Sequence, residues 1–180
     1  MLKTFLYRIY PTKKQERVLT QQLDECRWLY NHLLEERKTA WETQQEHLSY
    51  YDQANTLPAL KVLRPSLKAV HSQVLQNVAV RMDLGMKAFI RRIKEGATPG
   101  YPRFRGRNRY DSLTFPQVPG GCAIDTDRRR LVVHKVGDIK IVYHRNWEGV
   151  PKTATIRRHA TGKWFVTVSC EWEQIGRAHV

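Results

Sequence analysis

This sequence of 180 residues has few cysteines, no long apolar run and no catalytic motif. Its three cysteines, Cys26, Cys122 and Cys170, are far apart and form no C-x-x-C pair, so neither a disulfide framework nor a zinc site is predicted. No apolar run approaches the roughly 18 residues that span a bilayer, and the start lacks the apolar segment of a signal peptide. We therefore expect a cytoplasmic protein with no membrane partner.

Carboxylates that could form a catalytic site are also missing. A nuclease needs acidic residues that converge on metal ions, whereas the aspartates of the second half all fall in turns or loops. No phosphate-binding glycine loop, nucleophile elbow or Cys–His pair is present. The residues by themselves predict a binding protein without an active site of its own.

Positive charge is what the sequence has in excess. Lysine and arginine number 31 against 17 acidic residues, which gives a net charge of +14 at pH 7. Nucleic acid is the leading partner, because phosphate neutralisation releases condensed counterions, and a membrane surface is the runner-up. The 41% hydrophobic content is sufficient for one or two ordinary cores.

The charge is most concentrated in the stretch "PGYPRFRGRNRYDS", from Pro99 to Ser112. Arginines stand at every second position: Arg103, Arg105, Arg107 and Arg109. In extended chain their guanidiniums would share one side, roughly 6.6 Å apart, which suits a repeating polyanion. Tyr101 and its aromatic neighbours could stack on bases. The alternative is a solvated basic face with Phe104 as a buried anchor. Further arginines that we expect to contribute are Arg128, Arg129, Arg130, Arg145, Arg157 and Arg158.

The first half of the chain predicts one strand followed by helices. Residues 3–10 alternate as a strand, and Thr12 with Gln15 forms a capping box for a long amphipathic helix that runs to about Trp41. Ser66 is the expected cap of a second long helix that Gly96 and Pro99 end. The connection between them, residues 50–65, has room for a short third helix.

The second half predicts the short strands "LTFP", "RLVVHK", "IKIVYH", "TATIRRH" and "KWFVTVSCEW", separated by turn signals at Gly120, Gly137 and Gly162. This pattern is typical of an antiparallel barrel or sandwich. The isolated first strand has no partner among the helices, so we expect it to join this later sheet. The predicted fold class is α+β, with a helical lobe inserted into an antiparallel β domain. The expected boundaries are 1–11 and 98–173 for the β domain and 12–97 for the helices.

The last seven residues, "QIGRAHV", break the strand pattern and match the translation of a common sequencing adapter. We expect residues 174–180 to be non-native, disordered or packed on nothing, with the reading frame cut short upstream of them.

Several stretches together resemble TnpB-type (OrfB) proteins, the transposon-encoded relatives of type V CRISPR nucleases. They include "YRIYPTKKQERVL", "CRWLYNHLLEERKTAW" and "PGYPRFRGRNRYDSLTFPQ", occur in the family's order and cover nearly all of residues 3–173. The resemblance implies a wedge-like β-barrel, interrupted by a helical recognition lobe, that holds a guide RNA and reads a short DNA motif beside the transposon end. It also implies that magnesium and zinc belong to a C-terminal nuclease half. No cofactor and no cleavage are therefore expected of this chain.

The resemblance also assigns residues to the DNA motif. Those that align with the family's duplex-reading surface are Tyr51, Asn55, Ser72, Gln73, Gln76, Ser112 and Thr114. Gln and Asn side chains can pair bidentately with adenine edges, which fits an A·T-rich motif. The alternatives are an exposed helix face for the glutamines and strand-surface hydroxyls for Ser112 and Thr114.

Three further features remain open at this point. Arg27, Tyr30 and Asn31 match a family motif on the first helix, where a buried hydrogen-bonding role that links lobe and barrel competes with nucleic-acid contact. Gly85 departs from the family pattern and puts the straightness of the second helix in doubt. Descriptions of the family place a helix-turn-helix after Thr12, but the absence of a glycine turn favours one continuous helix.

The favoured function is the nucleic-acid-binding half of a transposon-associated, RNA-guided DNA endonuclease, with guide RNA and double-stranded DNA as partners. The alternatives are a free-standing DNA-binding transposase accessory or repressor and an RNA-binding structural module.

Overall fold

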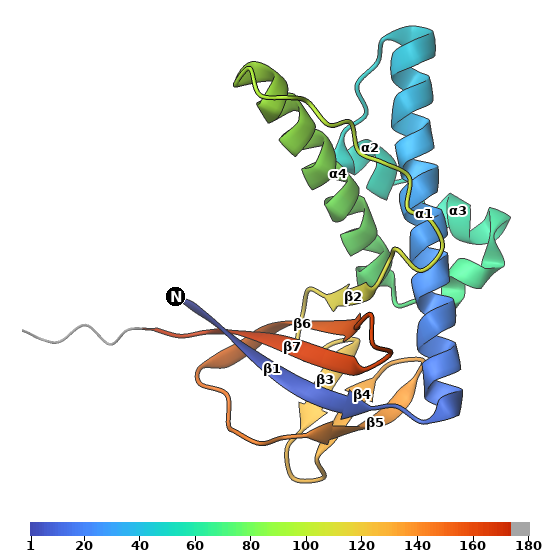
Figure 1. Ribbon diagram of the computed structural model, residues 1–180. Helices are drawn as coiled ribbons and strands as arrows, with labels where there is room; N and C mark the ends of the chain where they lie inside the picture. The colour runs from blue at the N-terminus through green and yellow to red at the C-terminus, as the bar shows by residue number, and fades with distance from the viewer. Residues whose placement is uncertain (174–180) are drawn as a thin grey trace, which may run out of the picture. The chain divides into compact units, whose positions relative to one another are not determined.

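The chain divides into two compact units in the computed structural model, which describes residues 1–173 (Figure 1). The sheet unit comprises Met1–Leu19 and Asp111–Val180, and the helical unit comprises Thr20–Tyr110. The arginine-rich stretch up to Arg109 therefore belongs to the helical unit. The expected domain boundaries stay a prediction, and the expected tail, 174–180, lies outside the described residues.

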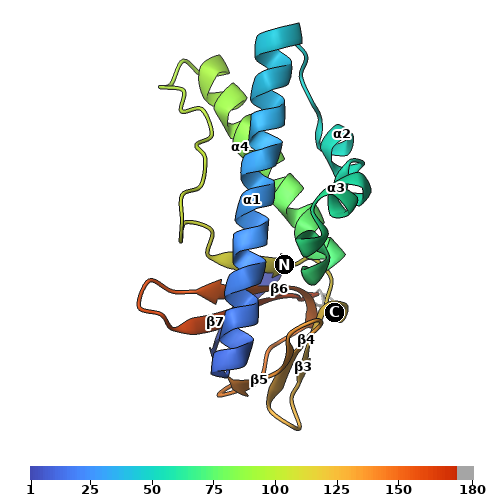
Figure 2. The same cartoon turned by 90° about the vertical axis from the view of Figure 1, so that its right-hand side faces the viewer.

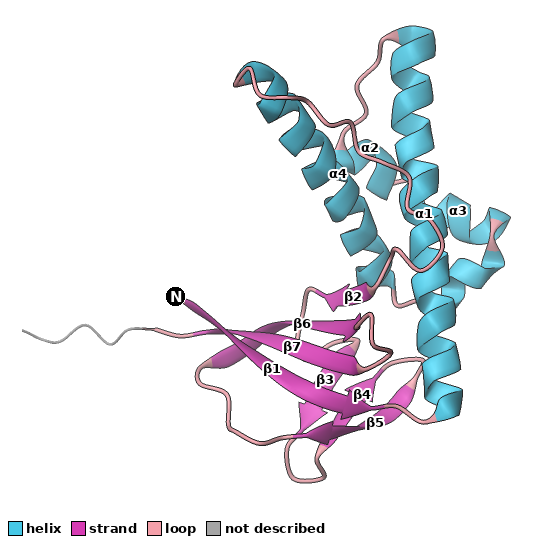
Figure 3. Ribbon diagram, viewed as in Figure 1, coloured by secondary structure: helices cyan, strands magenta, loops and turns pink. Residues whose placement is uncertain are grey.

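The sheet unit holds seven antiparallel strands that curve into a nearly closed, barrel-like sheet (Figure 3). The strands are β1 (Leu2–Tyr10), β2 (Ser112–Phe115), β3 (Cys122–Asp125), β4 (Arg130–Val133), β5 (Gly137–Val142), β6 (Val150–Arg158) and β7 (Trp164–Glu171). Their order is β2-β6-β7-β1-β5-β4-β3, so the first strand lies between β7 and β5. The α+β fold class and the pairing of the first strand with the later sheet are confirmed.

The strands alternate because successive side chains point to opposite faces. Phe5, Tyr7 and Ile9 of β1 are buried, whereas Leu6 and Tyr10 are about half exposed. The buried set continues across the sheet with Leu113, Phe115, Leu131, Val133, Ile139, Ile141, Ala154, Ile156, Trp164, Val166, Val168 and Cys170. The buried Tyr7 hydroxyl donates to the Arg145 carbonyl at 2.9 Å, and burial, followed by nearby Tyr143, raises the pKa of Tyr7 to about 12.

One strand was not expected from the sequence. β3 has only four residues, and it pairs with β4 through the tight connection between Asp125 and Arg130. The expected turns do occur, with Gly137 at φ 119° and Gly162 at φ 84°. A four-residue strand carries too little alternation to be distinguished from a loop, so its pairing partner defines it.

The helical unit is built from α1 (Lys13–Gln44), α2 (Tyr50–Ala54), α3 (Leu57–Leu63), the 3-10 helix η1 (Pro65–Ala69) and α4 (Ser72–Lys94). The first turns of α1 are assigned to the sheet unit. The predicted capping box is confirmed, since Thr12 N donates to Gln15 Oε1 at 3.0 Å and Gln15 N donates to Thr12 Oγ1 at 3.2 Å. The 32 residues of α1 form one helix without a turn, as predicted.

The predicted start of the second long helix is wrong. Ser66 lies in η1, and the chain is extended at Val70 before α4 begins. His71 caps α4 instead, because its ring nitrogen accepts from Gln73 N at 3.2 Å. Pro65 separates η1 from α3, because a proline cannot sit inside a longer helix, and the extended Val70 separates η1 from α4.

A buried polar network joins α1, α2 and α4. Arg37, which is 6% exposed, donates to Gln53 Oε1 at 2.7 Å and to Asp83 Oδ1 at 3.0 Å. Gln53 in turn donates to the Leu33 carbonyl at 2.8 Å. The buried apolar side chains of α1 and α4 include Leu29, Leu33, Leu34, Val78 and Met82. In Figure 1, α1 and α4 are closer together where α4 begins and diverge towards its end, and Figure 2 shows the same two helices from the side.

Candidate nucleic-acid interface

Residues 98–110, here called the arginine loop, are held against α1 by one side chain. Asn31 Nδ2 donates to the Arg105 carbonyl at 2.9 Å, and Arg105 N donates to Asn31 Oδ1 at 2.7 Å. This paired contact satisfies both backbone groups of Arg105 in the way that a neighbouring strand would. Asn31 was expected either to link lobe and barrel or to contact nucleic acid, whereas it holds the arginine loop inside the helical unit.

Aromatic and apolar contacts fix the rest of the arginine loop. The Tyr101 ring meets the edge of Phe89 at 5.1 Å between centroids, and Tyr110 is buried under the Arg81 guanidinium at 5.1 Å. Burial raises the pKa of Tyr110, so its hydroxyl stays protonated. Pro102 lies against α4 at Gly85. The helix is continuous through Gly85, so nothing in the structure supports the doubt about the straightness of α4.

The expected one-sided arginine ladder is interrupted by a turn. Arg107 and Asn108 form this turn, with Asn108 at φ 60° and Arg109 N donating to the Gly106 carbonyl at 3.0 Å. A turn breaks the period of two on which even spacing depends, so the four guanidiniums do not form one straight row. Asn tolerates the left-handed region better than most residues, which explains its place here.

The arginines of the loop have no acidic partner within residues 1–173, unlike Arg37, Arg64, Arg128 and Arg158. Among the described residues, no carboxylate pairs with Arg103, Arg105, Arg107 or Arg109, and Arg105 lies over the Tyr30 ring at 5.2 Å. By contrast, Arg128 pairs with Asp138 at 2.7 Å. Phe104 is 49% exposed, so it is not the buried anchor that the alternative required. The arginine loop therefore presents uncompensated positive charge on an ordered backbone.

The residues assigned to the DNA motif separate into two groups. Tyr51, Asn55, Ser72, Gln73 and Gln76 lie on α2 and the first turns of α4, two elements that contact each other within the helical unit. Tyr51 is 74% exposed and Gln76 is exposed, whereas Ser72 accepts a hydrogen bond from Lys61 Nζ at 2.9 Å. All five positions lie in the helical unit, and their contact with DNA stays a prediction.

Ser112 and Thr114 form the second group, on β2 of the sheet unit. Ser112 is buried, and Thr114 Oγ1 lies 3.1 Å from Thr155 Oγ1 on β6. Thr114 is thus a partly exposed strand hydroxyl, whereas the burial of Ser112 does not fit the strand-surface alternative, and the role of both residues in binding stays a prediction.

Sequence reasoning missed that Arg81 and Tyr110 support the arginine loop. The aromatic residues of this stretch were expected to stack on bases, whereas Tyr110 is buried in a tertiary contact between the loop and α4. The only signal in the sequence was the position of Tyr110, an aromatic residue directly after a run of charged ones.

A cavity of about 670 Å³ opens between the diverging halves of α1 and α4. It is lined mainly by apolar and aromatic side chains, with the Arg37–Asp83 pair and Lys87 at one side. Lys87 and Arg37 hydrogen-bond the Asp83 carboxylate and lower its pKa, although burial by itself would raise it. The aromatic lining is Trp41, His47, Phe89 and Tyr101.

Within the described residues, no group of three or more His, Cys, Asp or Glu side chains could hold a metal ion. Burial raises the pKa of Cys26 and of Cys122 to about 12, so both thiols are protonated at neutral pH. No helix in residues 1–173 is long and apolar enough to cross a membrane.

Comparison with known proteins gives consistent matches. Residues 1–46 match the family described as "Helix-turn-helix domain", of the OrfB_IS605 type. The chain is 26% identical over 174 residues to the "Putative RNA-guided DNA endonuclease InsQ" of Escherichia coli, a match that covers 96% of the chain and 41% of that protein. It is 27% identical over 177 residues to a "Putative RNA-guided DNA endonuclease" of Streptomyces pristinaespiralis, with 94% and 41% covered. The resemblance to the TnpB (OrfB) family is confirmed.

The family's helix-turn-helix description does not correspond to the fold of this TnpB-like chain. Residues 1–46 contain β1 and the uninterrupted helix α1, with the strand built into the sheet between β5 and β7. A helix-turn-helix motif needs two helices joined by a short turn. The matched segment therefore does not supply a DNA-reading helix pair.

The TnpB-like chain spans about 41% of the length of these curated relatives. What their names state about activity applies to those proteins.

Proposed function

We propose that this chain is the nucleic-acid-binding part of a transposon-associated, RNA-guided DNA endonuclease, and that it binds guide RNA and double-stranded DNA. The observation that carries the proposal is the arginine loop, whose four arginines have no carboxylate partner among the described residues while Asn31 fixes the loop backbone. Arginines without acidic partners on a fixed backbone favour the binding of a polyanion, because the loop loses little conformational entropy when it binds. The names of the relatives agree with this partner.

The DNA motif is proposed to be read by the polar residues of α2 and α4. Gln76 and Gln73 stand on successive turns of α4, and Tyr51 and Asn55 stand on α2, which packs beside it. Glutamine and asparagine pair with adenine through two hydrogen bonds each, which favours an A·T-rich motif. Ser112 and Thr114 are proposed as additional contacts from β2.

The first experiment measures RNA and duplex DNA binding at several salt concentrations. Replacing the four loop arginines by Ala should weaken binding to all sequences and reduce the salt slope by about 0.7 to 0.9 per lost phosphate contact. The control removes the same charge from exposed positions on α1: Lys13, Lys14, Arg17 and Lys38. An unchanged slope in the loop variant would contradict the proposal.

The second experiment separates the proposal from its alternatives. The chain is purified from cells that carry the transposon end, and the co-purified nucleic acid is sequenced. A discrete RNA that overlaps the transposon end supports an RNA-guided protein. Tight duplex binding without RNA would instead identify a free-standing DNA-binding accessory or repressor, and RNA binding without any DNA motif would identify a structural RNA-binding module.

Two expectations from the sequence belong to this proposal. Magnesium and zinc are proposed to be bound outside this chain, so its nucleic-acid binding should survive EDTA treatment. The cytoplasm is the proposed location, which fractionation of the native host would test.

A further inference from the structure

The cavity between α1 and α4 is a feature that the proposed nucleic-acid binding does not use. Its volume of about 670 Å³ lies within the range of roughly 300–1,000 Å³ that is usual for small-molecule sites. All of its lining residues, from Arg37 to Tyr101, belong to the helical unit. The two helices that form its main walls diverge towards the end of α4 (Figure 1). The walls of the cavity therefore do not depend on the sheet unit.

Two pairs of aromatic rings line the cavity. Trp41, near the end of α1, stacks on His47 with 4.4 Å between the ring centroids and 28° between the ring planes. Phe89 of α4 meets the Tyr101 ring edge-on at 5.1 Å between centroids. The remaining apolar lining residues are Leu48, Met86, Ile90 and Ile93. Because aromatic rings prefer to pack on other rings by their faces and edges, this lining favours a flat aromatic ligand.

The apolar lining is accessible to solvent. Trp41 and Ile93 are each about half exposed, and Ile90 and Tyr101 are each more than a third exposed. Large apolar side chains gathered in one concave place differ from the single exposed residues that are normal on a protein surface. A ligand that covers them removes apolar area from water, which is favourable. The cavity is therefore accessible to a ligand and gains free energy when one binds.

The charged side chains of the lining balance one another. Arg37 and Lys87 both contact the Asp83 carboxylate, at 3.0 Å and 2.9 Å, and Glu46 is an exposed lining residue. Two cations and two carboxylates give the lining no net charge, so it attracts neither an anion nor a cation. Burying a charged group against apolar side chains without a partner also costs free energy. The lining therefore favours a neutral ligand and disfavours the phosphates of a nucleic acid.

We infer that the cavity of the helical unit is a binding site for a small, neutral, flat aromatic molecule, held between the Trp41–His47 pair and the Phe89–Tyr101 pair. The inference goes beyond the proposed function, because it assigns a ligand that is not a nucleic acid. Tyr101 also belongs to the arginine loop, so a ligand that packs on its ring restrains the start of that loop. Occupancy of the cavity should therefore slow hydrogen exchange at residues 98–101.

The test uses two fluorescent probes that share one ring system. N-Phenyl-1-naphthylamine is neutral, whereas 8-anilinonaphthalene-1-sulfonate carries a sulfonate on the same rings. Both are titrated into the full chain in about 0.5 M salt, which screens the attraction of the sulfonate to surface arginines. The neutral probe should show one saturable site per chain. The sulfonate should bind at least about tenfold more weakly, because burying its charge in the apolar cavity costs free energy.

Two variants and a matched control locate the bound probe. Ile90→Asp places a carboxylate in the lining and should weaken binding of the neutral probe at least about tenfold. The control, Leu84→Asp, makes the same change at an exposed position of α4 outside the lining and should leave the affinity unchanged. Trp41→Ala removes one aromatic wall and should also weaken binding. All three side chains are exposed, and circular dichroism checks that each variant folds.

Several results would overturn the inference. Equal affinities of the neutral probe for Ile90→Asp and Leu84→Asp would place the probe outside the cavity. Equal affinities of the two probes would overturn the assignment to a neutral ligand. A dimer in sedimentation without probe that Ile90→Asp dissociates would show that a second copy of the chain fills the cavity instead. Unchanged hydrogen exchange at residues 98–101 would overturn the link to the arginine loop. The titrations contain no nucleic acid, so their result is independent of the proposed function.

Discussion

The buried interiors of the two units differ in their content of polar side chains. The inner face of the sheet unit consists almost entirely of apolar residues and cysteines, with Tyr7 as its polar member. The helical unit instead buries Gln22, Glu25, Arg37 and Gln53, each with a hydrogen-bond partner. Glu25 Oε2 accepts a hydrogen bond from Arg64 Nε at 2.8 Å, and the Arg64 guanidinium also lies over the Trp28 ring at 4.4 Å.

This difference follows from how strands and helices satisfy their backbone hydrogen bonds. Strands satisfy their backbone groups with their neighbours, so a sheet needs only an apolar inner face. The short helices α2, α3 and η1 bury too little apolar surface to fix their own positions. Directional polar contacts to α1 and α4 position them, which makes the helical unit dependent on single residues and on their ionisation.

Breaking the central polar contact should have the largest effect. Arg37→Ala removes the donor to Gln53 Oε1 and leaves the Asp83 carboxylate with the exposed Lys87 alone, and we expect a loss of about 3–5 kcal/mol in the free energy of unfolding. Hydrogen exchange measured by mass spectrometry should rise in α1, α2 and α4 and stay low in β1 and β7. The control, Arg128→Ala, removes an exposed pair and should cost less than about 1 kcal/mol. Equal effects of the two variants would remove the contrast between the units.

Acid should reproduce part of this loss. The pKa of Asp83 is lowered in the folded chain, so its contribution to stability is complete at neutral pH and disappears as the pH falls through the folded value. The pKa of Tyr7 is raised to about 12, so that group stays neutral throughout the acid range and adds no acid dependence to the sheet unit. Urea unfolding at pH 7 and below pH 4, followed by hydrogen exchange, measures the difference. Asp83→Asn should flatten the acid dependence of the helical unit.

Releasing the arginine loop should have a smaller, local effect. Asn31→Ala removes two hydrogen bonds to Arg105, worth about 1–2 kcal/mol together, and should raise hydrogen exchange at residues 98–110. Asn31→Asp retains the acceptor for Arg105 N and should give an intermediate result. RNA affinity should fall while the salt slope stays the same, because no phosphate contact is lost. A reduced slope would mean that Asn31 itself contacts the nucleic acid.

The smallest effect should have the opposite sign. A Cβ added at Gly85 would meet Pro102 and Tyr30 at 3.7 Å, an ordinary contact, so Gly85→Ala should stabilise α4 by about 0.5–1 kcal/mol. In the sheet unit, Gly149 has φ +85° and its Cβ would lie 2.3 Å from the Glu171 carbonyl oxygen. Gly149→Ala should therefore destabilise the chain. The melting temperatures of the two variants measure both effects, and a shift of both temperatures in the same direction would contradict the prediction.

Much of the fold follows from local patterns in the sequence. The strand before Pro11, the capping box of Thr12 and Gln15, and the uninterrupted α1 are local signals, and all three are confirmed. The predicted start of α4 was wrong because Ser66 is a good cap in isolation, whereas the extended Val70 ends the turn that follows it and α4 starts after His71. β3 was missed because its four residues include Ala123 and Asp125, types that are depleted in strands, so that only its pairing with β4 defines it.

The candidate interface was less predictable. Composition and alternation identified the arginine loop, but its attachment to Asn31 depends on a contact between residues 74 positions apart. Its turn at Asn108 is local, and the spacing of the arginines by itself did not indicate it. Charge can be read from a sequence, but the neighbours that leave it unpaired cannot.

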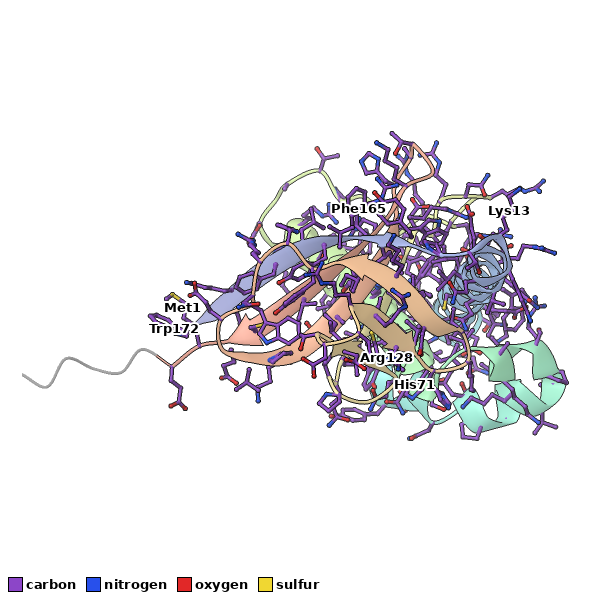
Figure 4. The ribbon with its side chains drawn as sticks, turned by 90° about the horizontal axis from the view of Figure 1, so that it is seen from below. Met1, Lys13, His71, Arg128, Phe165 and Trp172 are labelled. Atoms are coloured by element: carbon purple, nitrogen blue, oxygen red, sulfur yellow. The ribbon has the colours of Figure 1, made fainter. Side chains whose placement is uncertain are left out.

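One contact at the rim of the sheet has a practical use. Met1 and Trp172 exchange backbone hydrogen bonds, with Trp172 N donating to the Met1 carbonyl at 2.8 Å and Met1 N donating to the Trp172 carbonyl at 3.2 Å. Two positions this close (Figure 4) can be joined by a short linker, and exposed residues 45–47 can supply new ends. A circularly permuted chain that begins near α2, joins Trp172 to Met1 and ends with α1 would keep the described strands and helices, and would carry the arginine loop in the first half of its sequence.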